Sequence, residues 1–136
     1  MRKSLTFSDY FLLNTIQKMY EGDYINRDNN KTAFYIRIDC EVIAKFMNVD
    51  PEMVFQRLYY HLNKKYGYTE NDKTKVEFFA FEIGGVRHCI NYPYLCAVLA
   101  TMEDDQKELR NTKRLAWASL VISILGIFVQ YLMGKN

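Results

Sequence analysis

The sequence of 136 residues has few of the features by which enzymes and extracellular proteins are recognised. Its three cysteines, an odd number, show neither a CxxC nor a zinc-type spacing, so we expect reduced thiols in a cytosolic compartment. No glycine-rich phosphate loop and no HExxH or GxSxG motif occurs. These absences favour a protein that is not an enzyme and that needs no cofactor or metal ion.

Histidine is also scarce, and the net charge is small. His61 and His88 are the only histidines, and we expect both to pack inward, His61 from a helix and His88 from a strand. Since His88 and Cys89 are neighbours on that strand, their side chains point to opposite faces and cannot act as a base and its nucleophile. The 18 basic and 16 acidic residues give a formal charge of +2, too little for a global field that recruits nucleic acid or acidic lipid.

What the chain does have is a long uncharged run near its C-terminus, LAWASLVISILGIFVQYLM at 115–133. As a helix these 19 residues rise by about 28 Å, close to the roughly 30 Å thickness of the hydrocarbon layer. Their large apolar side chains favour insertion by roughly 3 to 6 kcal/mol. The membrane anchor residues lie at the two ends: the interfacial rings of Trp117 and Tyr131, and the flanking cations Arg114 and Lys135. The sequence therefore predicts one transmembrane helix, whereas a buried core helix would need a larger head to enclose it.

The basic residues around this run predict its orientation. Four of them precede the span and Lys135 alone follows it, which places the N-terminal part in the cytoplasm. The preceding four are Lys107, Arg110, Lys113 and Arg114. The expected organisation is a tail-anchored protein with a head (1–92), a juxtamembrane helix (93–114), the transmembrane helix (115–133) and a short tail (134–136).

Capping residues and hydrophobic spacing predict five elements in the head. These are a helix that starts near Thr6 and ends at Gly22, a strand in 32–38, a helix in 40–47 capped by Asp39, a helix from Pro51 to Gly67 capped by Asp50, and a hairpin of 75–83 and 86–92. Around Gly84 and Gly85 the hairpin should pair Ile83 with Val86, Glu82 with Arg87 and Phe81 with His88. Its buried face should then carry Phe79, Phe81, Ile83, Val86, His88 and Ile90.

This order of helix, strand, helix, helix and hairpin resembles a winged-helix domain, an α+β fold. Within it IAKFMNVDPEMVFQRL resembles a helix-turn-helix, with Asn48 at the turn where glycine is usual and Val49 and Val54 as core contacts. Arg57 departs from the pattern, because an apolar residue is expected there. The resemblance covers about residues 5–92 and implies a fold more than a function.

The third helix of the head is the candidate interaction helix. Its outward residues would enter the major groove if the domain read DNA, and they are Gln56, Arg57, Tyr60, Asn63 and Lys64. However, Asp50 and Glu52 put two carboxylates at the end that would approach phosphates, and the hairpin tip has no lysine or arginine. Protein contact is therefore the favoured function, and a membrane-tethered DNA-binding regulator is the alternative.

Small and polar residues recur at helical spacing in the membrane segment, which suggests an oligomer seam. Small side chains let helix backbones approach closely in lipid, and a glutamine can bond across the contact. The seam consists of Ala116, Ser119, Ser123, Gly126 and Gln130. The competing interpretation is that such residues are simply common in membrane helices. The resulting hypothesis is a homo-oligomer that forms through the transmembrane helix and acts as an adaptor or a membrane effector.

Overall fold

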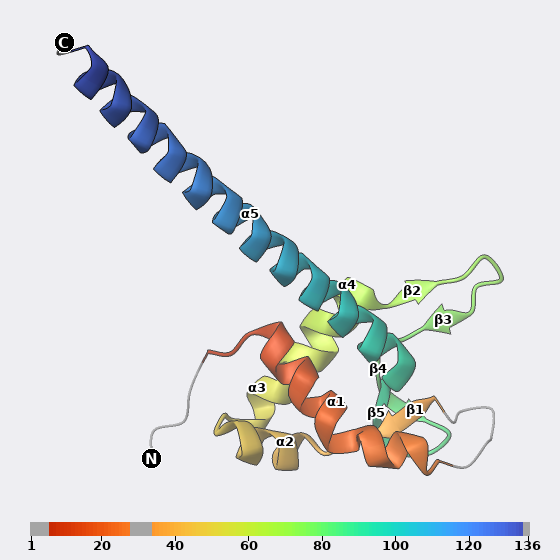
Figure 1. Cartoon of the computed structure of the whole chain (residues 1–136). Coiled ribbons are helices and arrows are strands. Elements are labelled where there is room, and N and C mark those ends of the chain that lie inside the picture. The colour runs from red at the N-terminus through yellow and green to blue at the C-terminus, as the bar shows by residue number, and fades with distance from the viewer. Residues whose placement is uncertain (1–5, 28–33, 135–136) are drawn as a thin grey trace. The chain divides into compact units, whose positions relative to one another are not determined.

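A computed structural model describes residues 6–27 and 34–134, which form an α+β head and a long C-terminal helix (Figure 1). The chain divides into two compact units, Met1–Leu99 and Ala100–Asn136. We call the first the head and the second the tail.

The head begins with helix α1 (Asp9–Ile25), whose ends differ from the sequence prediction. Ser8 is the N-cap, since its hydroxyl accepts a hydrogen bond from the Phe11 amide at 3.1 Å, so the predicted start at Thr6 is wrong. The helix also continues through Gly22, where we expected it to end. An isolated glycine costs a helix only about 1 kcal/mol relative to alanine, and packing of the apolar face offsets that cost.

Two capping carboxylates start the next helices as predicted. Asp39 accepts hydrogen bonds from the Glu41 and Val42 amides at the start of α2 (Cys40–Met47). Asn48, with a φ of 56°, ends that helix in the left-handed conformation. Asp50 then caps a continuous helical rod, which consists of α3 (Pro51–Gln56), the π-helical turn η1 (Arg57–Leu62) and α4 (Asn63–Tyr66) and ends at Gly67.

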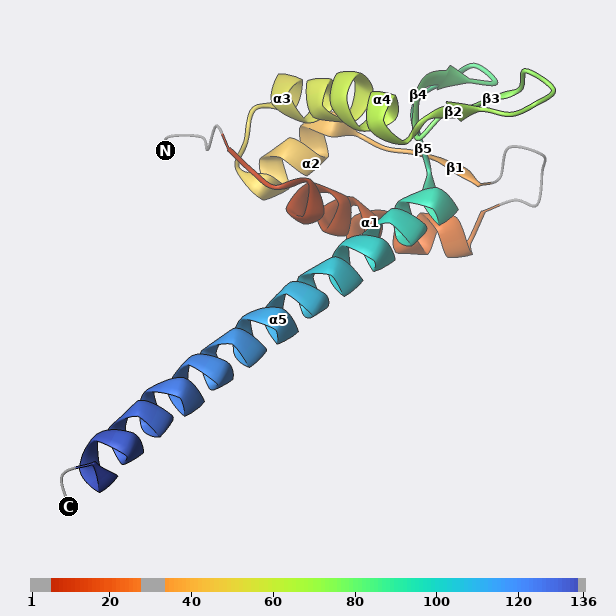
Figure 2. The ribbon, with the colours of Figure 1, turned by 90° about the horizontal axis from the view of Figure 1, so that it is seen from above.

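The sheet has three antiparallel strands in the order β1-β5-β4. These strands are β1 (Tyr35–Arg37), β4 (Phe79–Ile83) and β5 (Val86–Asn91). A separate small hairpin joins β2 (Tyr68–Thr69) to β3 (Lys75–Val76), as Figure 2 shows. The predicted pairs Ile83 with Val86 and Glu82 with Arg87 are confirmed, around glycines with φ of 58° and 82°.

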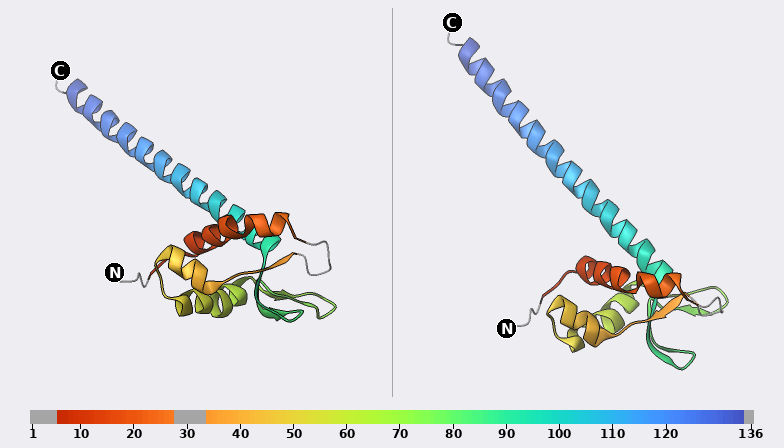
Figure 3. Two further views of the ribbon diagram at one scale, coloured as in Figure 1. Left: turned by 90° about the horizontal axis from the view of Figure 1, so that it is seen from below. Right: turned by 60° about the horizontal axis from the view of Figure 1, so that its bottom comes forward.

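The pairs on either side place Phe81 opposite His88 as predicted, and their rings lie 5.7 Å apart, but these two residues do not form a ladder pair themselves. His88 has a φ of 57°, a left-handed conformation that interrupts a regular strand. The predicted buried face is wrong in its outer half. Phe79 and Ile90 are fully buried, whereas Phe81 and Val86 are 42% and 43% exposed. The outer half of the hairpin lies away from the helices that cover its base (Figure 3).

The core of the head forms between the helices, the base of the sheet and the start of α5 (Tyr92–Met133). Leu95, Val98 and Leu99 are buried, so the head includes two turns of α5 beyond the boundary predicted at 92. The Tyr92 hydroxyl donates a hydrogen bond to the Gln17 carbonyl at 2.7 Å. The fully buried large side chains are Leu12, Leu13, Ile16, Ile38, Ile43, Val54, Leu58, Leu62, Phe78, Phe79, Ile90 and Leu95.

The tail is the rest of α5, helical without a break from residue 100 to Met133. Its most apolar window of 18 residues has a mean hydropathy of 2.0 and is 0% buried. Every large apolar side chain from Leu115 to Met133 is between 50% and 75% exposed. By length and composition α5 is therefore able to cross a membrane.

Candidate functional site

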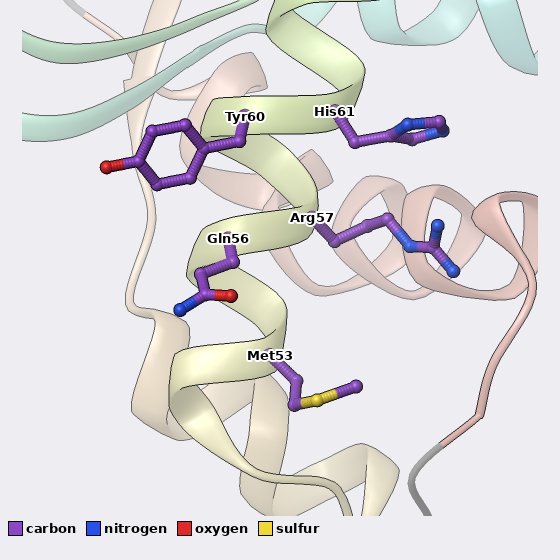
Figure 4. Close-up of a pocket in the computed structure, with 5 residues that line it drawn as sticks. All are labelled: Met53, Gln56, Arg57, Tyr60 and His61. Carbon is purple, nitrogen blue, oxygen red and sulfur yellow. The ribbon is translucent and has the colours of Figure 1, made fainter.

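The candidate interaction helix carries an open hollow of about 460 Å³ on its surface. Five side chains from α3 and η1 line it: Met53, Gln56, Arg57, Tyr60 and His61 (Figure 4). Figure 4 shows Arg57 and His61 pointing to one side of the helix, while Gln56 and Tyr60 point to the other. The hollow thus includes three of the five predicted interaction residues.

The π-helical turn sets this arrangement. The Asn63 amide donates to the Leu58 carbonyl, five residues earlier, instead of the usual four. The extra residue in this hydrogen-bonded loop shifts the side chains of Arg57–Leu62 around the helix axis relative to those of α3. Such turns occur frequently at functional sites, although the sequence alone gave no signal for this one.

Asp9, at the start of α1, holds the Arg57 and His61 side of the hollow. Its carboxylate lies 3.3 Å from Arg57 Nε and 3.3 Å from His61 Nε2. Arg57 Nη2 also donates to the Phe7 carbonyl at 3.3 Å, and the guanidinium stacks over the Phe7 ring. Arg57 therefore joins η1 to α1, and His61 is half exposed beside it rather than packed inward as predicted.

Of the other predicted interaction residues, some form hydrogen bonds within the head and others are exposed to solvent. Asn63 was expected to point outward, but its Oδ1 accepts hydrogen bonds from the Phe78 and Phe79 amides at 2.9 and 3.1 Å. Phe78 directly precedes β4 and Phe79 is its first residue, and both are fully buried, so Asn63 points toward the sheet and the prediction for Asn63 is wrong. Gln56 donates to Glu52 at 3.0 Å on the surface. Tyr60 is 66% exposed and Lys64 is exposed, so these two are the most accessible.

A second hollow of about 360 Å³ lies beside the first, between the helical rod and the β2–β3 hairpin. Tyr59 and Tyr60 meet there edge to face with ring centroids 4.9 Å apart. Sequence reasoning missed most of this surface, and the only available signal was the density of tyrosines between residues 59 and 68. The lining residues are Tyr59, Tyr60, Asn63, Lys64, Gly67, Tyr68, Thr69 and Lys75.

An aromatic cluster connects the helical rod to the outer half of the β4–β5 hairpin. Phe55 stacks on Tyr59, with centroids 5.5 Å apart, and its ring lies 5.4 Å from the His88 ring. Phe81 packs against the same His88 ring at 5.7 Å. This packing holds His88 in place despite its unusual backbone conformation, and it gives His88 a structural role.

The charges on this side of the head do not favour phosphate binding. Asp50 caps α3, and Glu52 follows it in the first turn. On the hairpin, Arg87 lies 3.8 Å from Glu82 and stacks over the Phe81 ring. Arg57 is neutralised by Asp9, which leaves Lys64 as the accessible cation of the predicted interaction residues.

The cysteine thiols are poor nucleophiles. Burial raises the pKa of the Cys40 thiol to about 11 and raises the pKa of the Cys89 thiol as well. Both thiols are therefore protonated at neutral pH and weakly nucleophilic. Within residues 6–27 and 34–134, no group of three or more histidine, cysteine, aspartate or glutamate side chains could hold a metal ion.

The tail presents its predicted seam as one arc. At about 100° per residue, Ala116, Ser119, Ser123, Gly126 and Gln130 fall within roughly 80° of the helix circumference. The Ser123 hydroxyl donates to the Ser119 carbonyl at 2.9 Å, so it is satisfied within the helix. Of the anchor residues, Arg114, Trp117 and Tyr131 are exposed on the helix, and Lys135 lies outside the described residues.

Comparison of the chain with protein-family models, with curated proteins and with solved structures gives no match. The residues and their geometry alone therefore support the function proposed below.

Proposed function

We propose that this chain is a single-pass membrane protein, anchored by residues 115–133 of α5, whose head acts by protein contact rather than by catalysis. One observation carries the proposal: the apolar window in α5 has a mean hydropathy of 2.0 and is 0% buried. A core helix of a soluble protein would be buried. Hydrocarbon is the solvent in which such a surface is stable.

Flotation of the expressed protein with membranes, followed by alkaline carbonate extraction, tests the anchor. We expect the chain to stay with the membranes after both treatments. Recovery as a soluble protein without detergent would overturn the proposal.

The proposed orientation, with the head in the cytoplasm, rests on the basic residues before the span. The sequence contains one glycosylation sequon, Asn30-Lys31-Thr32, which provides a native reporter of sidedness. In microsomes we expect no glycan at Asn30. A second sequon, appended after Asn136 on a spacer, should be glycosylated instead. A glycan on Asn30, removed by Asn30→Gln, would reverse the orientation.

We further propose that the head is a winged-helix-like domain. The element order α1, β1, α2, α3 to α4, β4 and β5 supports this, as does a sheet in which β1 pairs with β5. The π-helical turn and the extra β2–β3 hairpin are departures from the simplest form of such a domain.

The partners and charges of the candidate residues within the head favour protein contact over DNA binding. Arg57 is paired with Asp9, Asn63 accepts two backbone amides, and Asp50 and Glu52 are negative. In contrast, α2 exposes an apolar pair: Phe46 is 69% exposed and Val42 is 50% exposed, one turn apart. Exposed apolar and tyrosine side chains are typical of protein interfaces.

Two experiments separate these alternatives. Titration of duplex DNA into the full chain in detergent should show no binding at low salt. Binding that weakens with salt and is lost in Lys64→Ala would favour the membrane-tethered regulator.

The second experiment places a photo-crosslinking residue at Phe46 or Tyr60. It should give a discrete protein adduct in cells, with exposed Lys18 on α1 as the matched control. Equal labelling at all three positions would contradict a specific surface.

Self-association through the seam of the tail is the final part of the proposal. It is supported by the single arc of small residues, where a side chain at Gly126 would meet nothing within 4 Å of the same chain. In a membrane association reporter, we expect Gly126→Ile and Gln130→Leu to reduce the signal and Val121→Leu on the opposite side to leave it unchanged. An unchanged signal in the first two variants would remove the seam.

A further inference from the structure

The part of α5 between the head and the proposed span carries an unusual distribution of charge. Residues 103–114 contain four acidic and four basic side chains, and all eight are exposed. At about 100° per residue, the four basic side chains fall within an arc of roughly 120°. These are Lys107, Arg110, Lys113 and Arg114.

The acidic side chains are separated from this arc. Asp104, Asp105 and Glu108 fall in an arc of roughly 100° on the other side of the helix. Glu103 alone shares the basic side, and it lies farthest from the span. One helix therefore presents a cationic face and an anionic face.

Charge is also separated by depth along the helix. At 1.5 Å per residue, Arg114, Lys113 and Arg110 stand within about 8 Å of the start of the uncharged run, and the acidic side chains stand about 10 to 18 Å from it. The headgroup layer of a bilayer is about 5 to 8 Å thick on each side. The three cations therefore lie at the level of the lipid phosphates, whereas every carboxylate lies beyond the headgroup layer, farther from the membrane.

The basic face has few partners of its own. Lys107 Nζ lies 3.4 Å from Asp104 Oδ1, an exposed ion pair that contributes little. Within residues 6–27 and 34–134, no side-chain hydrogen bond or ion pair joins Arg110, Lys113 or Arg114 to another residue. Their charges are available to an external anion.

We propose that this basic face binds the phosphate headgroups of anionic lipids and so selects the lipids around the anchor. The inference rests on the proposed function, because only a membrane-inserted α5 brings these residues to the headgroups. The basic side also points away from the seam, which lies roughly opposite on the helix. A tail that self-associates would therefore still present the basic face to lipid.

Trp117 is the only tryptophan of the chain, it is exposed, and it lies on the basic side three residues after Arg114. Its fluorescence therefore reports the neighbouring lipids. The full chain is reconstituted in phosphatidylcholine vesicles that contain equal mole fractions of either brominated phosphatidylglycerol or brominated phosphatidylcholine. Label in both leaflets makes the quenching independent of the direction of insertion.

We expect quenching by the anionic lipid to be stronger by about fivefold in association constant, the effect of one cation near an anionic surface. The variant Arg110→Gln/Lys113→Gln/Arg114→Gln should make the two lipids equal. The matched variant Asp104→Asn/Asp105→Asn/Glu108→Gln should keep the preference. Salt should weaken the preference, since the Debye length falls from about 30 Å at 0.01 M to about 3 Å at 1 M.

The outcomes separate this inference from the proposed function. Equal quenching of the unaltered chain by both lipids would overturn the lipid-binding face and leave the anchor intact. A preference that survives the triple glutamine variant would equally overturn the assignment to these residues. Absence of quenching by either lipid, together with failure to float with the vesicles, would overturn the membrane anchor itself.

Discussion

The head and the tail use the same apolar residue types in opposite ways. In the head Leu58 and Leu62 are 0% exposed, whereas in the tail Leu120 and Leu125 are 50% and 58% exposed. The head alternates apolar and polar positions, so each element has a face that can be buried against another. From 115 to 133 the tail has no charged face, and no arrangement within a single helix could bury its surface. The pattern of polar residues, more than the number of apolar ones, decides which solvent each region requires.

The strongest way to break this comparison is to place charge in the middle of the tail. Leu125→Arg with Phe128→Lys should cost about 6 to 8 kcal/mol of insertion free energy, more than the roughly 3 to 6 kcal/mol that the segment gains. We expect the protein to leave the carbonate-resistant membrane fraction. Leu125→Ala with Phe128→Ala should stay in that fraction, and retention of the charged variant would show that the segment is not in lipid.

In the head, the equivalent test is to remove a buried side chain. Leu58→Ala should lower the free energy of unfolding by about 2 to 5 kcal/mol, because it leaves a cavity between the helical rod and the rest of the core. For a domain of this size each kcal/mol lowers the Tm by about 4 to 8 °C. Circular dichroism of the full chain in detergent measures this shift.

The matched control for the core is Phe46→Ala on α2. Because this side chain is 69% exposed, we expect a change within about 0.5 kcal/mol in the free energy of unfolding. If Phe46→Ala were as destabilising as Leu58→Ala, the exposed apolar pair of α2 would be covered in the folded protein, and the proposed contact surface would already be occupied.

A smaller effect is expected where a polar side chain accepts hydrogen bonds from buried backbone amides. Asn63→Ala removes the acceptor of two buried amides, those of Phe78 and Phe79, and should cost about 1 to 3 kcal/mol. Asn63→Asp keeps an acceptor oxygen at the same place and should lose clearly less stability. Equal losses in the two variants would show that the amide group acts through packing.

The sequence predicted the features of the head that depend on local chemistry. Asp39, Asp50 and Pro51 start helices where capping rules place them, and Gly84 and Gly85 form the hairpin turn. Local rules failed where tertiary packing decides. The exposed outer half of the hairpin could not be predicted, because pairing identifies a face but not how far the helices cover it.

The candidate site shows the same limit. Helical spacing identified four residues as lying on the surface of one helix: Gln56, Arg57, Tyr60 and Lys64. All four line one or both of the two hollows. Helical spacing could not show that Asp9, almost fifty residues earlier, pairs with Arg57, or that Asn63 bonds to β4. Long-range partners and the π-helical turn depend on contacts that no periodic pattern encodes.

The smallest expected effect concerns the ion pairs that join α1 to η1. Asp9 lies 3.3 Å from both Arg57 and His61, whose side chains are 37% and 49% exposed. Solvent screens such pairs, so Asp9→Asn should change the free energy of unfolding by about 1 kcal/mol or less. In a double-mutant cycle with Arg57→Gln, we expect a coupling of about 0.2 to 1 kcal/mol that shrinks in high salt. A larger coupling that ignores salt would mean that the hollow is shielded from water, and the head would then have a second buried region with charged groups inside it, quite unlike the apolar core that stabilises the rest of the head.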